Sequence, residues 1–297
     1  MGLQGSIAAI VTPFTPDGSE INEEELRAHV DRQIAAGVDG ILACGGTGEF
    51  TALSEAERRR VVEISVSQAA GRVPVVANTS GLSTGEAIRH TLHAKSVGAD
   101  AVMVATPFYD VPDFESTREY YRLVALATDL PVMLYHFPPG THMRLSPEQM
   151  VQLADENPTV QYVKDSSQEP FILSKLVTEY RDRIGLFIGE EVLIPTAILL
   201  GAKGLVSGAF NFVTPAYAEM IKAGRAGDDA RVVAIWRELL PFTMCVASLP
   251  YVAACKAMVE ILGHEVGPVR SPGARLTPQQ RRDLEQHARA LNPAYLA

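Results

Sequence analysis

Eight short apolar runs, each followed by a longer amphipathic segment, constrain the fold of this chain more than any other feature of its sequence. The runs are rich in β-branched residues and apolar almost throughout, which is typical of strands that are covered on both faces of a parallel sheet. They are Ile7–Thr12, Gly40–Cys44, Pro74–Asn78, Ala101–Thr106, Pro131–Phe137, Val160–Asp165, Gly185–Gly189 and Gly204–Ser207.

Helix start signals lie between these runs. Ser54 and Glu57 have the spacing of a capping box, and Ser146-Pro147 and Thr277-Pro278 place proline at the first helical position. Ser83 and Thr214-Pro215 are predicted to open two further helices.

Eight strand–helix units predict an α/β fold, the (β/α)₈ TIM barrel. A doubly wound open sheet is the alternative, but it usually has fewer strands, and no GxGxxG motif follows the first run. We assign residues 1–224 to a barrel that carries the active site and residues 225–297 to a C-terminal helical extension. Helices are expected there at residues 228–246, 250–262 and 278–291.

Charge and composition exclude several classes of partner. The net charge of −9 argues against nucleic-acid binding, which needs a concentrated basic surface. The most apolar stretch, residues 193–212, contains Lys203 and three glycines, so no membrane partner is expected. Cys44, Cys245 and Cys255 form no CxxC spacing, and the first residues lack the basic region of a signal peptide. We therefore expect reduced thiols and a cytoplasmic location.

Active sites of this fold lie at the C-terminal ends of the strands, and Lys164 is the one lysine of six that closes a predicted strand. Desolvation in a barrel mouth lowers the pKa of a lysine and yields a free amine near neutral pH. Lys164 is therefore a candidate nucleophile, with a charged counter-ion for a substrate as the other interpretation.

Three other strand ends supply candidate groups. Tyr135, which ends the fifth run, could shuttle protons for Lys164 or could simply pack. Gly45-Gly46-Thr47-Gly48 forms either an anion-binding nest or a tight turn. Glu190 could hydrogen-bond a polyol or cap the next helix. His136 has no carboxylate at a useful interval and no His/Asp cluster has ligand spacing, so no metal and no cofactor are expected.

Taken together, these residues resemble the dihydrodipicolinate synthase / N-acetylneuraminate lyase family of Schiff-base aldolases, over nearly the whole chain. The resemblance is carried by motifs that follow one another in order at strand ends. They are Ala9-Ile10-Val11-Thr12-Pro13-Phe14 with Asp17-Gly18, Gly45-Gly46-Thr47-Gly48-Glu49, Thr106-Pro107-Phe108-Tyr109, Tyr135-His136-Phe137-Pro138 and Val163-Lys164-Asp165-Ser166-Ser167. Gly267-Pro268-Val269-Arg270, near the end of the chain, also fits.

The resemblance implies that Lys164 forms an imine with pyruvate or a similar 2-oxo acid while Tyr135 relays protons. Thr47 and the amides around Gly46 would hold the carboxylate of that acid. The protonated imine is an electron sink, so one lysine supports aldol cleavage, condensation or dehydration.

The resemblance also implies a homotetramer, built as a dimer of dimers, in which Tyr109 enters the site of a neighbouring subunit. Val206 would touch the bound acid through its backbone, and the adjacent Ser207 is a further candidate for substrate binding.

Two departures from the family pattern direct the choice of reaction. Synthases that condense pyruvate with aspartate semialdehyde carry a hydroxyl residue at the position of Gly46 and an arginine at that of Gly140. Without that arginine the clamp for the aldehyde's carboxylate is lost. We therefore expect a lyase for 2-oxo-3-deoxy sugar acids or related 2-oxo acids.

Three alternatives stay open. The Gly-Gly-Thr-Gly-Glu-Phe string resembles 5-dehydro-4-deoxyglucarate dehydratases, although Tyr135-His136-Phe137-Pro138 does not match their fifth strand. The second alternative is 4-hydroxy-tetrahydrodipicolinate synthase. The third is a non-catalytic sensor of 2-oxo acids.

Overall fold

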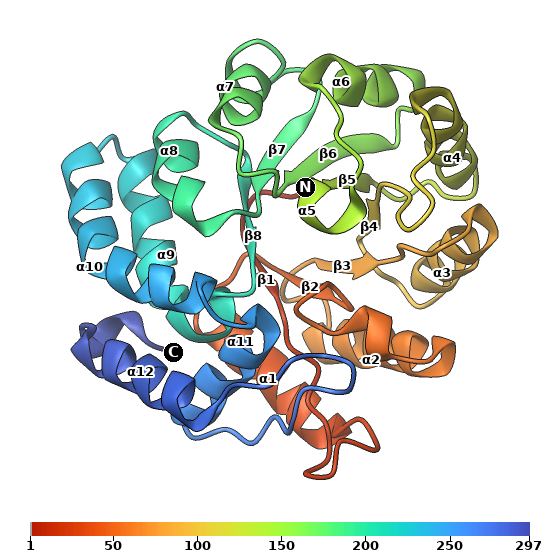
Figure 1. Cartoon of the computed structure of the whole chain (residues 1–297). Helices are drawn as coiled ribbons and strands as arrows, with labels where there is room; N and C mark the ends of the chain where they lie inside the picture. Colours follow the sequence, from red (N-terminus) through yellow and green to blue (C-terminus); the bar gives the residue numbers. More distant parts are fainter. Residues whose placement is uncertain (1) are drawn as a thin grey trace.

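A computed structural model describes residues 2–297 and shows a closed barrel of eight parallel strands in chain order (Figure 1). Each strand pairs with its neighbour in sequence, and β8 pairs with β1 to close the ring. The strands are β1 Gly5–Ala9, β2 Gly40–Ala43, β3 Val75–Asn78, β4 Ala101–Ala105, β5 Val132–His136, β6 Val160–Asp165, β7 Gly185–Ile188 and β8 Gly204–Ser207. The predicted TIM barrel is confirmed.

Helices surround the barrel, as expected when a parallel sheet is covered on its outer face. The helices that connect each of the first seven strands to the next strand are α1 Glu23–Ala35, α2 Glu55–Ala69, α3 Thr84–Ser96, α4 Phe114–Leu126, α5 Pro138–Thr141, α6 Pro147–Glu156, α7 Pro170–Thr178 and α8 Ile194–Leu199. After β8 come α9 Phe210–Arg225, α10 Asp229–Ala247, α11 Tyr251–Ile261 and α12 Pro278–Ala290. Short 3₁₀ turns are η1 Phe50–Ala52, η2 Glu191–Leu193 and η3 Pro293–Tyr295.

The predicted helix starts follow from capping chemistry. Ser54, Ser146 and Thr277 each accept a hydrogen bond from the backbone three residues on, and the side chain at that position bonds back to the cap. Ser83 caps α3 through its side chain. These four predictions are confirmed, and α10, α11 and α12 agree with the three expected C-terminal helices to within two residues.

Two elements, β1 and α9, differ from their predicted bounds by more than one residue. β1 ends at Ala9, not Thr12, because the Val11 amide donates to the Asn211 side chain at 3.0 Å and leaves the sheet. α9 begins at Phe210, before the predicted start at Thr214-Pro215, and a non-helical residue, Val213, interrupts it there. Two helices therefore join at this kink, and the second of them begins at Thr214-Pro215, as predicted.

The barrel is filled by its own side chains. Inward-facing residues form one apolar cluster, which Tyr135 covers at the C-terminal end of the strands. The cluster comprises Leu3, Ile7, Ala9, Leu42, Val76, Ala101, Met103, Met133, Tyr162, Phe187 and Val206. A separate, larger core lies between the strands and the helices. This plugged interior leaves only the strand ends open to chemistry.

The helices after α9 gather on one side of the barrel (Figure 1). α10 packs against α8, α9 and α12, and α11 packs against α9, α10 and α12. Within residues 2–297, every helix is too short or too polar to cross a membrane.

Candidate active site

Lys164 and Tyr135 lie side by side at the ends of β6 and β5. The two strands pair in a register that sets Tyr135 directly opposite Lys164, and both side chains face the barrel axis. The Lys164 Nζ lies 4.3 Å from the centre of the Tyr135 ring. Only 7% of Lys164 is exposed. The structure thus brings together the two residues that sequence analysis proposed for the chemistry.

Burial changes the acid–base properties of Lys164. It lowers the pKa of this amine from its ordinary value to about 8, while the nearby charge of Glu191 partly opposes the shift. Space for the side chain comes from Gly189, at the end of β7, where an added Cβ would lie 2.6 Å from Lys164 Cε. Part of the Lys164 amine is therefore uncharged near neutral pH. A side chain at position 189 would collide with Lys164, so the lysine fits because this residue is glycine.

The pKa of Tyr135 is shifted in the opposite direction from that of Lys164. Burial raises the pKa of its phenol, and the Ser166 hydroxyl only partly opposes that effect. The phenol therefore stays protonated and can serve as a proton donor. Its ring stacks on Phe137, with the centroids 5.6 Å apart.

Glu191 sits at the end of β7 and receives hydrogen bonds from two hydroxyls. Ser207 Oγ and Tyr251 Oη each donate to Glu191 Oε1 at 2.5 Å. Tyr251 begins α11, so the helical extension reaches the barrel mouth. Sequence analysis missed this role for Tyr251, because no motif links a residue of the extension to the end of β7.

Glu190, the other carboxylate of this pair, is half-buried and forms no side-chain capping bond to the turn that follows it. Burial, and then the neighbouring charge of Glu191, raises the pKa of Glu190. Both carboxylates are hydrogen-bond acceptors at the end of β7.

The loop Gly45–Glu49 brings Thr47 to the end of β8. An added Cβ at Gly208 would lie 2.7 Å from Thr47 Oγ1 and 2.9 Å from Tyr251 Cε1, so these three residues are in close contact. An added Cβ at Gly46 would meet nothing within 4 Å. Val206, one residue before Ser207, is fully buried in the barrel interior.

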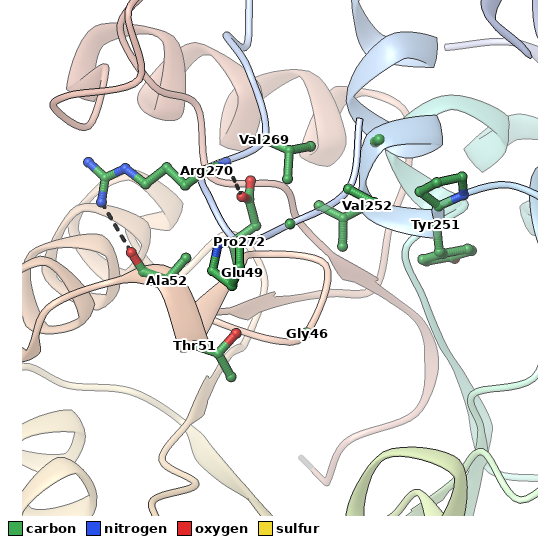
Figure 2. Close-up of a pocket in the computed structure, with 13 residues that line it drawn as sticks. Gly46, Glu49, Thr51, Ala52, Tyr251, Val252, Val269, Arg270 and Pro272 are labelled. Atoms are coloured by element: carbon green, nitrogen blue, oxygen red, sulfur yellow. Dashed lines mark hydrogen bonds between the residues drawn. The ribbon is translucent and has the colours of Figure 1, made fainter. Parts of the chain in front are cut away.

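A cavity of about 350 Å³ opens beside this loop, with Gly46 and Tyr251 in its wall (Figure 2). The rest of its lining comes mainly from η1, the start of α11 and the segment that precedes α12. Lys164 and Tyr135 do not line it.

Tyr109 is the one predicted site residue that lies apart from the others. It is 87% exposed, on the loop after β4, and its backbone is left-handed with φ of 78°. The Tyr109 side chain is therefore directed toward solvent and is not covered by its own chain.

His136 corrects an expectation of sequence analysis, which found no carboxylate at a useful interval from it. His136 Nδ1 donates to Asp165 Oδ1 at 2.7 Å, because the backbone amide of Leu145 donates to the other ring nitrogen, Nε2. Asp165 also accepts from Ser167 at 2.9 Å. The partner lies on the adjacent strand, which no spacing along the chain reveals. This buried network fixes the strand ends next to Tyr135 and Lys164.

Gly140, where the resemblance calls for an arginine in the synthases, lies in the short helix α5. An added Cβ there would overlap the ring of Phe137. The Phe137 ring, stacked on Tyr135, thus occupies the space that a side chain at position 140 would enter. Within residues 2–297, no group of three or more His, Cys, Asp and Glu side chains is arranged to hold a metal ion.

Comparison with known proteins places this geometry in one family. Residues 2–291 match the dihydrodipicolinate synthetase family. The chain belongs to that family. It is 38% identical over 282 residues to the 4-hydroxy-tetrahydrodipicolinate synthase of Thermomicrobium roseum, which covers 95% of this chain and 92% of the relative.

Solved structures of proteins from this family have the same fold. The dihydrodipicolinate synthase of Aquifex aeolicus is 32% identical, with a TM-score of 0.92 and 97% of both chains covered. YagE, a prophage protein of the dihydrodipicolinic acid synthase family from E. coli K12 solved in complex with pyruvate, is 28% identical, with a TM-score of 0.93 and 97% of this chain and 98% of the other covered. Because the family consists of class I aldolases, the chain is a Schiff-base-forming lyase.

Proposed function

We propose that this lyase cleaves or dehydrates a hydroxylated 2-oxo-3-deoxy acid through an imine on Lys164. The observation that carries the proposal is the buried amine of Lys164, with its pKa lowered to about 8, lying against the protonated phenol of Tyr135. YagE binds pyruvate, the product that aldol cleavage of such an acid would release.

The proposed reaction begins when the free amine of Lys164 attacks C2 of the 2-oxo acid. The resulting carbinolamine loses its hydroxyl as water, and the Tyr135 phenol supplies the proton for that departure. Since Lys164 Nζ rests on the face of the Tyr135 ring, the carbinolamine oxygen itself would bridge the amine and the phenol.

The iminium then accepts an electron pair from the substrate. In aldol cleavage the C4 hydroxyl loses its proton, the C3–C4 bond breaks, and the pair enters the iminium to give an enamine and an aldehyde. In dehydration a proton leaves C3 and the enamine expels the C4 hydroxyl. After aldol cleavage the enamine takes up a proton at C3 and becomes the imine of pyruvate. Both routes then end with hydrolysis of the imine, which releases the free amine.

Recognition of the substrate would come from the ends of the neighbouring strands. Thr47 and the amides around Gly46 would hold the carboxylate, and the backbone of Val206 would lie along the 2-oxo group. Glu190, Glu191 and Ser207 would hydrogen-bond the hydroxyls of the distal chain, since ionised carboxylates are acceptors for hydroxyl donors. A site with two carboxylates and no arginine at Gly140 favours a neutral polyol tail over an anionic one.

The exposed Tyr109 supports an assembly as the functional form. We propose a homotetramer, built as a dimer of dimers, in which Tyr109 of each subunit reaches the site of its partner. A phenol that is 87% exposed on one subunit would be buried there.

A panel of 2-oxo-3-deoxy sugar acids of five to seven carbons tests the function. Each compound is incubated with enzyme, and pyruvate release and dehydration products are measured in parallel. We expect turnover of at least one member, and cyanoborohydride with pyruvate should modify Lys164. Binding without any turnover would support a 2-oxo acid sensor instead.

A second candidate, 4-hydroxy-tetrahydrodipicolinate synthase, is favoured by the name of the relative that is 38% identical. Condensation of pyruvate with aspartate semialdehyde is assayed beside the panel. Since Gly140 supplies no cation for the semialdehyde carboxylate, we expect condensation to be slower than the best sugar-acid reaction by a factor of about 100 or more. A faster condensation would reverse the order of the two candidates.

The pH dependence of imine formation should report the pKa of Lys164. With a pKa of about 8, roughly one-tenth of the amine is free at pH 7 and roughly nine-tenths at pH 9. The rate of reductive trapping at low pyruvate should therefore rise about tenfold over this range and then level off. In Glu191→Gln the midpoint should move to lower pH, since the Glu191 charge raises the pKa of Lys164. A rate that keeps rising beyond pH 10 would contradict the assignment.

A further inference from the structure

A second buried lysine, Lys256 on α11, is paired with a buried carboxylate beside the site. Lys256 and Glu49 are 2% and 5% exposed, and Lys256 Nζ lies 2.6 Å from Glu49 Oε1. Lys256 Nζ also donates to the Pro268 carbonyl at 2.9 Å and lies 4.0 Å from the centre of the Phe14 ring. Charges enclosed in this way depend on each other, because removal of one leaves the other buried without compensation.

Glu49 is the last residue of the Gly45–Glu49 loop, which carries Thr47. The backbone of Glu49 is left-handed, with φ of 58°, and so is that of Cys44, which precedes the loop, with φ of 57°. Side-chain-bearing residues disfavour this conformation, so contacts outside the loop must hold it. The Glu49 carboxylate provides one of them, since its Oε2 accepts from the backbone amide of Arg270 at 2.9 Å (Figure 2). Thr12 Oγ1 donates to the Gly48 carbonyl and Asn78 Nδ2 to the Cys44 carbonyl, both at 2.7 Å.

Lys256 belongs to the same helix as Tyr251, whose hydroxyl donates to Glu191. Figure 2 shows Glu49 and Tyr251 on different sides of the cavity that Gly46 also lines. The helix and the loop meet again at Gly208, where Thr47 and Tyr251 leave no room for a methyl group. The ion pair therefore joins two elements at a distance from the chemistry, and those elements touch each other at the site.

We propose that Lys256 and Glu49 are positioning residues, which lock the Gly45–Glu49 loop against α11 so that the cradle for the substrate carboxylate is formed before substrate arrives. This inference rests on the proposed function, which assigns Thr47 and its neighbouring amides to that carboxylate. Neither charged group needs to touch the substrate. Loss of the pair should weaken capture of the 2-oxo acid while the reactivity of Lys164 is retained.

The test compares Glu49→Gln, Lys256→Met and the double variant with the wild-type protein. Cyanoborohydride trapping is followed at increasing pyruvate, which gives a half-saturating concentration and a maximal rate for each protein. We expect each single change to raise the half-saturating concentration about tenfold or more, with the maximal rate within about threefold. The double variant should recover part of the loss, because no unbalanced charge stays buried.

Lys175→Met is the matched control, since Lys175 pairs with Glu148 and Glu179 at the surface, and its trapping curve should be unchanged. If Lys256→Met does not fold, Glu49→Gln decides alone, because it keeps the volume and the bond from Arg270. If the variants unfold at lower temperature but keep the wild-type half-saturating concentration of pyruvate, the Lys256–Glu49 pair only stabilises the fold. That result would overturn the inference. A wild-type protein that is never modified at Lys164 would instead reject the proposed function.

Discussion

Replacement of Lys164 by methionine should abolish turnover, with a loss on the order of 10⁴-fold or more, because no other group can form the imine. Methionine keeps most of the length and apolar character of the lysine stem, in a place where only 7% of the residue is exposed. The barrel should therefore stay folded, since the change removes a buried amine that forms no salt bridge within residues 2–297.

Lys203→Met is the control for this experiment. Lys203 precedes β8 and thus lies at the opposite end of the barrel from Lys164, and it is exposed. Its replacement should leave turnover and pyruvate trapping unchanged. Residual activity of Lys164→Met above a few per cent, in protein free of wild-type contamination, would show that the nucleophile lies elsewhere.

Tyr135→Phe should lower kcat by a factor on the order of 10² to 10⁴, the usual contribution of a positioned proton donor. The variant keeps the ring that stacks on Phe137 and that lies 4.3 Å from Lys164 Nζ, and loses only the phenolic oxygen. Trapping with pyruvate should still modify Lys164 completely, but more slowly, because dehydration of the carbinolamine lacks its proton source.

Measuring both the rate and the final extent of pyruvate trapping on Lys164 separates a catalytic role of Tyr135 from a structural one. A structural role alone would lower the melting temperature and change trapping only in proportion to unfolded protein. Phe137→Leu tests the packing of the ring separately, since it removes the stacking partner and leaves the phenol in place. If Tyr135→Phe kept kcat within about threefold of wild type, the proton relay would have to be assigned to another group.

Much of the fold was accessible from local patterns in the sequence. Apolar runs covered on both faces identify parallel strands, and the pairs at Ser54, Ser146 and Thr277 identify helix starts, because both signals depend on neighbours along the chain. The end of β1 was misplaced for the opposite reason. Asn211 binds Val11 from 200 residues away, and no local pattern encodes that contact.

Some residues of the candidate site could likewise be predicted from local sequence patterns, and others could not. Lys164 and Tyr135 could be predicted because strand ends of a barrel converge, so position within a strand is enough to bring them together. Tyr251 could not, since its hydroxyl reaches Glu191 from a helix that the barrel pattern does not contain. The partner of His136 was missed because Asp165 lies across a strand pair, and strand register is a property of the folded sheet.

The contact between Tyr251 and Glu191 has a consequence for biosynthesis. A nascent chain that has emerged as far as Ser207 already contains every strand of the barrel, together with the amine and the phenol. Such a chain still lacks Tyr251, which lines the cavity and supplies the second of the two hydroxyls that donate to Glu191. The cavity beside the Gly45–Glu49 loop is therefore completed only when α11, which is synthesised after the barrel strands, has docked against them.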